Sequence, residues 1–298
     1  MTKILKICVF LVFIGRAYQY LFFDAPFRAF LWDESLLQDI IENIFNTPWN
    51  EYVTNPTVNI WIQRIIQCNG LLFLFSAISS LAIHHKNIKF LKLPIFISGV
   101  LLILLSLLSA KEKFYHYGQF FEHAIQFGIP FVLLFAIKKE NTIKKVSFVL
   151  KILVATTFTS HGLYALGYYP VPGTFIDMTI NSIGVTEDNA VLLLYIVGIL
   201  DIVLSILIFV PKIAKYALIY ACFWGLITAS ARVIANFNVD FIDSSLHQSL
   251  YLVVYRIPHG VIPLLIYYLD YVYKSFKKGS ALHPITDPLN NPLLKRSQ

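Results

Sequence analysis

Eight long apolar stretches divide this chain of 298 residues, and the polar segments between them alternate in the sign of their charge. A run of about 20 apolar residues can cross the roughly 30 Å hydrocarbon core of a bilayer as a helix. The predicted spans are residues 4–23, 62–83, 93–109, 119–137, 146–168, 190–210, 215–236 and 248–271. The sequence therefore predicts an all-α polytopic membrane protein with eight transmembrane helices.

The alternating charges predict the orientation of these spans. Lysines gather at the amino terminus, in every second connection and in the carboxy-terminal tail, for example Lys3, Lys86, Lys144, Lys212 and Lys277. Acidic residues occupy the other connections, among them Asp33, Glu112, Glu187, Asp188 and Asp240. Lysine-rich connections of membrane proteins stay in the cytoplasm. We therefore expect a multi-pass protein of a bacterial-type inner membrane with both termini in the cytoplasm.

Composition and cysteine usage exclude several other classes of protein. Hydrophobic residues make up 57% of the chain, which is more than a soluble domain of this length carries. The net charge of +7 comes from the lysine-rich connections, so it indicates contact with membrane lipid and no nucleic-acid partner. Cys8, Cys68 and Cys222 lie far apart in predicted spans, and no metal-ligand spacing occurs. We therefore expect no metal site, and the sequence indicates no cofactor.

The two halves of the chain share a weak internal similarity. Residues 13–16 (Phe-Ile-Gly-Arg) match residues 158–161 (Phe-Thr-Ser-His), and further short matches follow in the same order. An even number of spans in each half would give both halves the same orientation. The sequence predicts two parallel four-helix units, residues 1–145 and 146–273, and chance similarity among apolar segments is the alternative.

Local patterns predict three further features. Asp33 can cap an amphipathic helix over residues 33–46, which we expect on the outer membrane surface. Pro258 and Pro263 should kink the last span. The polar, proline-containing segment 274–298 should be a disordered cytoplasmic tail.

Several ionisable residues fall inside predicted spans, toward the outer half of the bilayer or near its middle, and five of them are candidates for a common site: Arg16, His161, Asp201, Arg256 and His259. Such residues are costly in hydrocarbon and usually face the bundle interior. We therefore predict an outward-facing polar pocket that these five residues line. A purely structural salt bridge of Asp201 and interhelical hydrogen bonds of the histidines are the alternatives. Arg232, near the outer end of its span, is expected to snorkel to the membrane surface.

Short motifs in the second half resemble those of the DoxX-like membrane proteins. They are Ser160-His161-Gly162 at the end of one span, the segment with Pro170, Pro172 and Gly173, and Gly198-Ile199-Leu200-Asp201 in the next span. The resemblance covers about residues 150–271, whereas the first half has Phe73 in place of Asp201. It implies a four-helix bundle. Some members of that family are associated with membrane redox systems, including thiosulfate oxidation to quinone and the maturation of periplasmic dehydrogenases.

Three classes of function remain open at this stage. The leading hypothesis is a non-catalytic component of an envelope redox or lipid process that binds a quinone or a lipid headgroup in the predicted pocket. A secondary transporter of a small anionic or amphipathic substrate is the first alternative, because parallel repeats and a midplane acid are typical of transporters. A membrane enzyme that uses His161 or His259 as a base on a lipid-soluble substrate is the second.

Overall fold

The computed structural model describes residues 1–138 and 142–273, and the predicted tail lies outside the described residues. Within those ranges every regular element is a helix, and eight helical segments are long and apolar enough to cross a membrane. The all-α polytopic fold is therefore confirmed. The spans are α1 (Thr2–Phe22), α5 (Pro56–Ala82), α6 (Ile88–Glu112), α7–α8 (Tyr117–Phe121 and Ala124–Lys138), α9 (Ile143–Ala165), α11 (Glu187–Leu207), α12 (Ala214–Ile234) and a final segment that contains α13 (Ile242–Val254) and α14 (Pro258–Tyr267).

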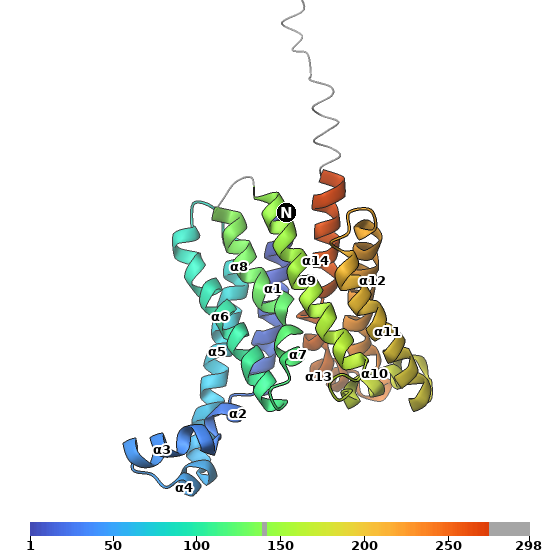
Figure 1. The fold of residues 1–298 in the computed structure, drawn as a ribbon. Coiled ribbons are helices and arrows are strands. Elements are labelled where there is room, and N and C mark those ends of the chain that lie inside the picture. The colour runs from blue at the N-terminus through green and yellow to red at the C-terminus, as the bar shows by residue number, and fades with distance from the viewer. Residues whose placement is uncertain (139–141, 274–298) are drawn as a thin grey trace, which may run out of the picture.

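The connections separate to the two ends of the bundle (Figure 1). At one end, here called the acidic end, lie α2 (Arg28–Leu31), α3 (Glu34–Ile44), α4 (Trp49–Thr54), α7 and α10 (Gly173–Ile183). The amino terminus and the turns that join α5 to α6 and α11 to α12 lie at the opposite, lysine-rich end. This arrangement agrees with the charge pattern of the sequence. That the lysine-rich end faces the cytoplasm stays a prediction.

The spans form two groups of four with the same order of neighbours. In the first group α1 packs on α5 and α8, while α6 packs on α5 and α8. In the second group α9 packs on α11 and α14, while α12 packs on α11 and α14. The groups meet where α8 contacts α9 and where α1 contacts α13 and α14. A tandem repeat would produce this order, and the superposition of the two halves stays a prediction.

The predicted amphipathic helix is α3. Asp33 precedes it, and its side chain accepts a hydrogen bond from the backbone N–H of Leu36 at 3.2 Å, so the helix begins where the capping residue places it. The Asp33 carboxylate also pairs with the ammonium of Lys111 at the end of α6. Apolar side chains such as Ile40 and Ile44 stay exposed. An exposed apolar face next to a transmembrane bundle is typical of a helix that lies in the membrane interface.

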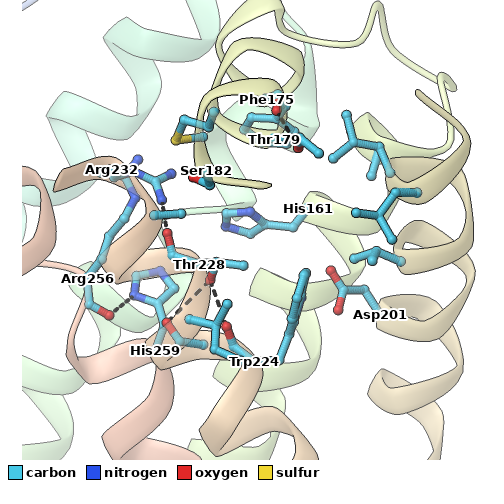
Figure 2. A pocket seen from close by; sticks show the side chains of 18 of the residues that line it. His161, Phe175, Thr179, Ser182, Asp201, Trp224, Thr228, Arg232, Arg256 and His259 are labelled. Carbon is cyan, nitrogen blue, oxygen red and sulfur yellow. Dashed lines mark hydrogen bonds between the residues drawn. The ribbon is translucent and has the colours of Figure 1, made fainter. Parts of the chain in front are cut away.

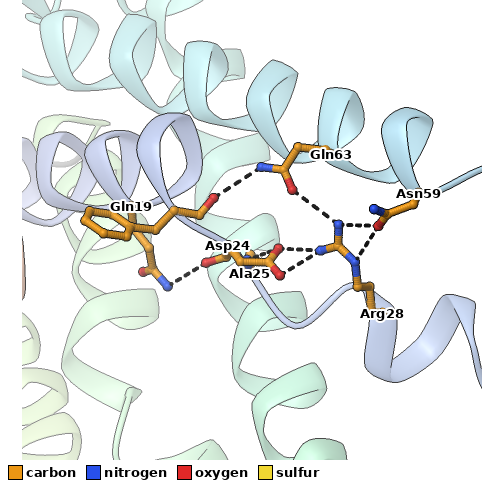
Figure 3. Close-up of polar contacts among 7 residues, drawn as sticks. Gln19, Asp24, Ala25, Arg28, Asn59 and Gln63 are labelled. Atoms are coloured by element: carbon orange, nitrogen blue, oxygen red, sulfur yellow. Dashed lines mark hydrogen bonds and ion pairs between the residues drawn. The ribbon is translucent and has the colours of Figure 1, made fainter. Parts of the chain in front are cut away.

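A polar network holds the segment after α1 against the start of α5 (Figure 3). The Arg28 guanidinium donates to both carboxylate oxygens of Asp24, at 2.6 and 2.7 Å, and to Oδ1 of Asn59 at 2.8 Å. Gln63 of α5 donates to the backbone carbonyl of Phe23 at 3.2 Å. These bonds fix where the chain leaves the bundle to form α2, α3 and α4.

The last span is broken, although the sequence predicted only kinks. Helix α13 ends at Val254, a turn covers residues 255–257, and α14 begins at Pro258. Proline has no backbone N–H and its ring clashes with the preceding turn, so it favours the first position of a new helix. Pro263 lies inside α14, where the helix continues past it to Tyr267. A short π-helix, Tyr268–Val272, follows.

Candidate functional site

A cavity of about 220 Å³ lies inside the second helix group, with α9, α11, α12 and α14 around it and α10 across its end (Figure 2). Its charged and imidazole side chains are His161, Asp201, Arg232, Arg256 and His259. Four of the five residues predicted to line a pocket therefore line one cavity. They come from three different helices and from the break in the last span.

Arg16, the fifth predicted residue, lies outside this cavity. Its guanidinium donates to Oε1 of Gln126 at 2.5 Å and to Oε1 of Gln19 at 2.6 Å, both in the first helix group. It also lies 3.9 Å from the ring centroid of Tyr255, the residue before Arg256. Arg16 thus contacts Tyr255 from outside the cavity, because its side chain projects from α1 toward α8 and the helix break.

Arg232 takes the place expected for Arg16. It does not snorkel to the surface: only 8% of the residue is exposed, and its Nη1 donates to the Thr228 carbonyl at 2.6 Å. Helix α10 packs against α12, so the Arg232 side chain stays under α10 and reaches into the cavity. Among the described residues no carboxylate forms an ion pair with Arg232 or Arg256.

Glycines allow the helices to approach closely beside the ionisable residues. A Cβ on Gly162 would lie 2.8 Å from the carbonyl oxygen of Gly198, which stands three residues before Asp201. A Cβ on Gly225 would lie 2.7 Å from the backbone carbon and oxygen of His259. Small residues at such crossings let membrane helices pack backbone to backbone. The pairs α9–α11 and α12–α14 are thereby held at the positions that bring the polar side chains together.

The helix break fixes how His259 is presented to the cavity. Its Nδ1 lies 3.0 Å from the Arg256 carbonyl oxygen, and because a carbonyl can only accept, Nδ1 carries the proton of this hydrogen bond. The other ring nitrogen, Nε2, is buried and without a partner. The His161 ring lies edge-on to the His259 ring, with 6.1 Å between the ring centroids.

Asp201 faces the bundle interior, as expected, but forms no ion pair in the described part of the chain. Trp224 is the side chain that interacts with its carboxyl group, while the buried Oδ1 has no partner. Ser182 Oγ of α10 is also buried and unpartnered. Buried polar atoms without partners are rare in folded proteins. Asp201, Ser182 and His259 all line the same cavity, so their unused hydrogen-bonding capacity is available to a molecule bound there.

Helix α10 was missed in the sequence, which indicated a loop with Pro170, Pro172 and Gly173. The residues it turns toward the cavity recur at helical spacing: Phe175, Met178, Thr179, Ser182 and Ile183. That periodicity was the available signal. Trp224 and Thr228, also missed, stand on the face of α12 that carries Gly225 and Arg232.

Comparison with protein-family models, with curated proteins and with solved structures found no match to this chain. Within the described ranges, three or more histidine, cysteine or acidic side chains nowhere converge in a way that could hold a metal ion. The arrangement that remains is a small cavity with two guanidinium donors, two imidazoles and one carboxyl group.

Proposed function

We propose that the second helix group binds the polar head of a lipid-soluble molecule, a quinone or a lipid headgroup, and that the protein is a non-catalytic component of an envelope redox or lipid process. The observation that carries this proposal is the set of unpartnered groups in the cavity: Oδ1 of Asp201, Nε2 of His259, and two guanidiniums without a carboxylate partner in the described chain. Polar groups at membrane depth are expensive, so they usually mark a ligand or ion pathway.

The resemblance to DoxX-like proteins supports the redox form of this proposal. The motifs that carry it, Ser160-His161-Gly162 and Gly198-Ile199-Leu200-Asp201, lie against each other across the α9–α11 contact, and His161 and Asp201 both line the cavity. The residues that carry this resemblance thus coincide with the candidate site, which supports a quinone as one form of the ligand. We place the acidic end, where α10 covers the cavity, on the outer side of the inner membrane.

The test is mass spectrometry of small molecules that copurify with the protein from its native membrane. Wild-type protein is compared with Arg232→Gln, and Lys113→Gln, which alters an exposed lysine away from the cavity, is the control. We expect one lipid-soluble species that is retained by wild type and Lys113→Gln and depleted from Arg232→Gln. Equal recovery from all three proteins, or only bulk lipid in each, would contradict the proposal.

Transport is the second candidate, and the break in the last span favours it. Secondary transporters often bind their substrates where a membrane helix is discontinuous, and the break at residues 255–257 places Arg256 and His259 at the cavity. Reconstituted vesicles loaded with the copurified molecule would distinguish transport from binding. Efflux that depends on Asp201 supports transport, and retention of the molecule supports a binding role.

A further inference from the structure

The part of the cavity lining that is exposed on the outside of the bundle is apolar. Three of its lining residues are also exposed on the outside of the bundle: Ile183 of α10 and Ile227 of α12, each 57% exposed, and Leu193 of α11, 38% exposed. All three are apolar. Leu193 stands six residues into α11 and Ile227 seven residues before the end of α12, about 10 Å from the helix ends at 1.5 Å per residue. At that depth Leu193 and Ile227 lie within the hydrocarbon, whereas Ile183 ends α10 at the acidic end of the bundle.

The cavity carries an excess of positive charge on one side. Arg232 and Arg256 lie on the side opposite Asp201 (Figure 2). Arg256 donates to the hydroxyl of Tyr255, and Arg232 donates to a backbone carbonyl, so neither is neutralised by a carboxylate contact in the described chain. The acid that faces them from the first group, Glu122, does not line the cavity. The complement of two neighbouring guanidiniums is an anion with several oxygens.

Glu122 is already engaged elsewhere. Its Oε1 accepts a hydrogen bond from Gln119 at 2.5 Å and lies 3.7 Å from Nε2 of His123. The Glu122 carboxylate lowers the positive potential in the cavity from outside it. Because Glu122 does not line the cavity, its oxygens cannot accept hydrogen bonds from groups inside. The groups inside include Nε2 of His259, which accepts a hydrogen bond when the ring is neutral, because Nδ1 holds the proton. A hydroxyl group on the ligand would donate a hydrogen bond to this nitrogen.

The size of the cavity limits what can enter. Sites that enclose a whole drug-sized ligand measure about 300–1,000 Å³, whereas this cavity measures about 220 Å³. It can hold a head group of a few carbon and oxygen atoms, and it cannot also hold an acyl or isoprenoid chain. The chain of a lipid ligand must therefore leave through the apolar rim between α11 and α12.

We infer that the cavity binds the head group of an anionic amphiphile that enters sideways from the bilayer between α11 and α12, with its acidic group at Arg232 and Arg256 and a hydroxyl at Nε2 of His259. This inference rests on the proposed function and narrows its ligand to a hydroxyl-bearing phosphate or carboxylate head on an apolar chain.

The test uses two single-chain lipids with the same palmitoyl chain. Lysophosphatidylglycerol has an anionic phosphate and free hydroxyls, and 1-palmitoylglycerol has free hydroxyls but no phosphate and no charge. Full-length protein in a neutral detergent is titrated with each, and bound lipid is measured by native mass spectrometry. We expect the anionic lipid to bind at least about tenfold more tightly, since hydrogen bonds to charged groups are worth that much or more. Arg232→Gln should abolish the difference.

A pair of tryptophan substitutions tests the sideways entrance. Ile227→Trp adds a bulky ring at the rim, and the control Ile206→Trp adds the same ring on α11 at a residue that is 63% exposed and does not line the cavity. Both sites face lipid, so both variants should fold. We expect Ile227→Trp to bind the anionic lipid at least about tenfold more weakly, and Ile206→Trp to bind like wild type.

The outcomes separate this inference from the proposed function. Equal binding of the two lipids, or a neutral quinone recovered from native membranes, would overturn the anionic ligand and leave the proposed binding function standing. Equal binding by Ile227→Trp and Ile206→Trp would overturn the entrance. Failure of every probe to bind, with no copurifying molecule, would overturn both the inference and the proposed function.

Discussion

Replacing Gly225 by alanine should separate α12 from α14 and displace His259. The new Cβ would lie 2.7 Å from the backbone carbon and oxygen of His259 and 2.8 Å from the nitrogen of Gly260. Carbon atoms in ordinary contact are about 3.5–4.0 Å apart, so the two backbones must move apart by roughly 0.8 Å or more. Backbone atoms cannot rotate out of the way as a side chain can. The whole contact between the two helices therefore has to shift.

Overpacking of this kind costs about 1–3 kcal/mol. The better helix propensity of alanine, about 0.5–1 kcal/mol, offsets part of that cost. We expect Gly225→Ala to be about 1–2 kcal/mol less stable than wild type. Because His259 moves with α14, ligand binding in the cavity should weaken as well. Thermal unfolding in detergent and the lipid titration measure the two effects on the same preparation.

Gly99→Ala is the matched control. Gly99 also lies within a span, but its Cβ would meet the ring end of Phe131 at 2.9 Å, and that ring can turn aside. We expect less than about 1 kcal/mol of destabilisation and no change in binding, since side-chain rearrangement is the smaller response. If Gly225→Ala were as stable as Gly99→Ala and bound ligand equally well, the α12–α14 contact would not be what positions His259.

Three further predictions concern single residues. Asp201→Asn should change the free energy of unfolding by no more than about 1 kcal/mol, because no ion pair is lost, while ligand binding falls; a large loss of stability would make Asp201 a structural residue. Cysteine labelling from outside intact cells should modify Thr186→Cys and not Asn87→Cys, and the reverse pattern would invert the topology. The hydrogen bond from Lys111 lowers the pKa of Asp33, so the contact of α3 with α6 should persist above the ordinary aspartate pKa near 4 and be lost only as the pH falls below it. Lys111→Gln should raise the pKa of Asp33 in a carboxyl NMR titration, and an unchanged value would contradict the pairing.

The spans could be predicted because membrane crossing depends on quantities that a sequence displays directly. Apolar length and the sign of the flanking charges identified all eight helices. The ends were less well predicted: α5 begins at Pro56, six residues before the predicted start. Polar residues such as Asn59 lower the local hydropathy before residue 62, but Asn59 accepts a hydrogen bond from Arg28 within the helix, which continues beyond the apolar run.

The sequence predicted how deep in the membrane the candidate site residues lie, but not which way their side chains point. Counting residues from a span end gives the height of a side chain in the bilayer, which was enough to find His161, Asp201 and His259. It does not give the side of the helix that faces a particular neighbour. Neither Arg16 nor Arg232 therefore lies where it was expected: Arg16 is buried against Gln126 in the first group, and Arg232 points into the cavity.

The first helix group contributes to the cavity although it does not line it. Tyr255, in the break of the last span, lies between two guanidiniums, with Arg16 at 3.9 Å and Arg256 at 4.7 Å from its ring centroid. Gly15 of α1 permits this arrangement, because a Cβ there would lie 2.9 Å from Cβ of Tyr255. Stacking of arginine on tyrosine stabilises both side chains. Helix α1 thus packs against the turn between α13 and α14 on the side away from the cavity, and it supports the segment that presents Arg256 and His259.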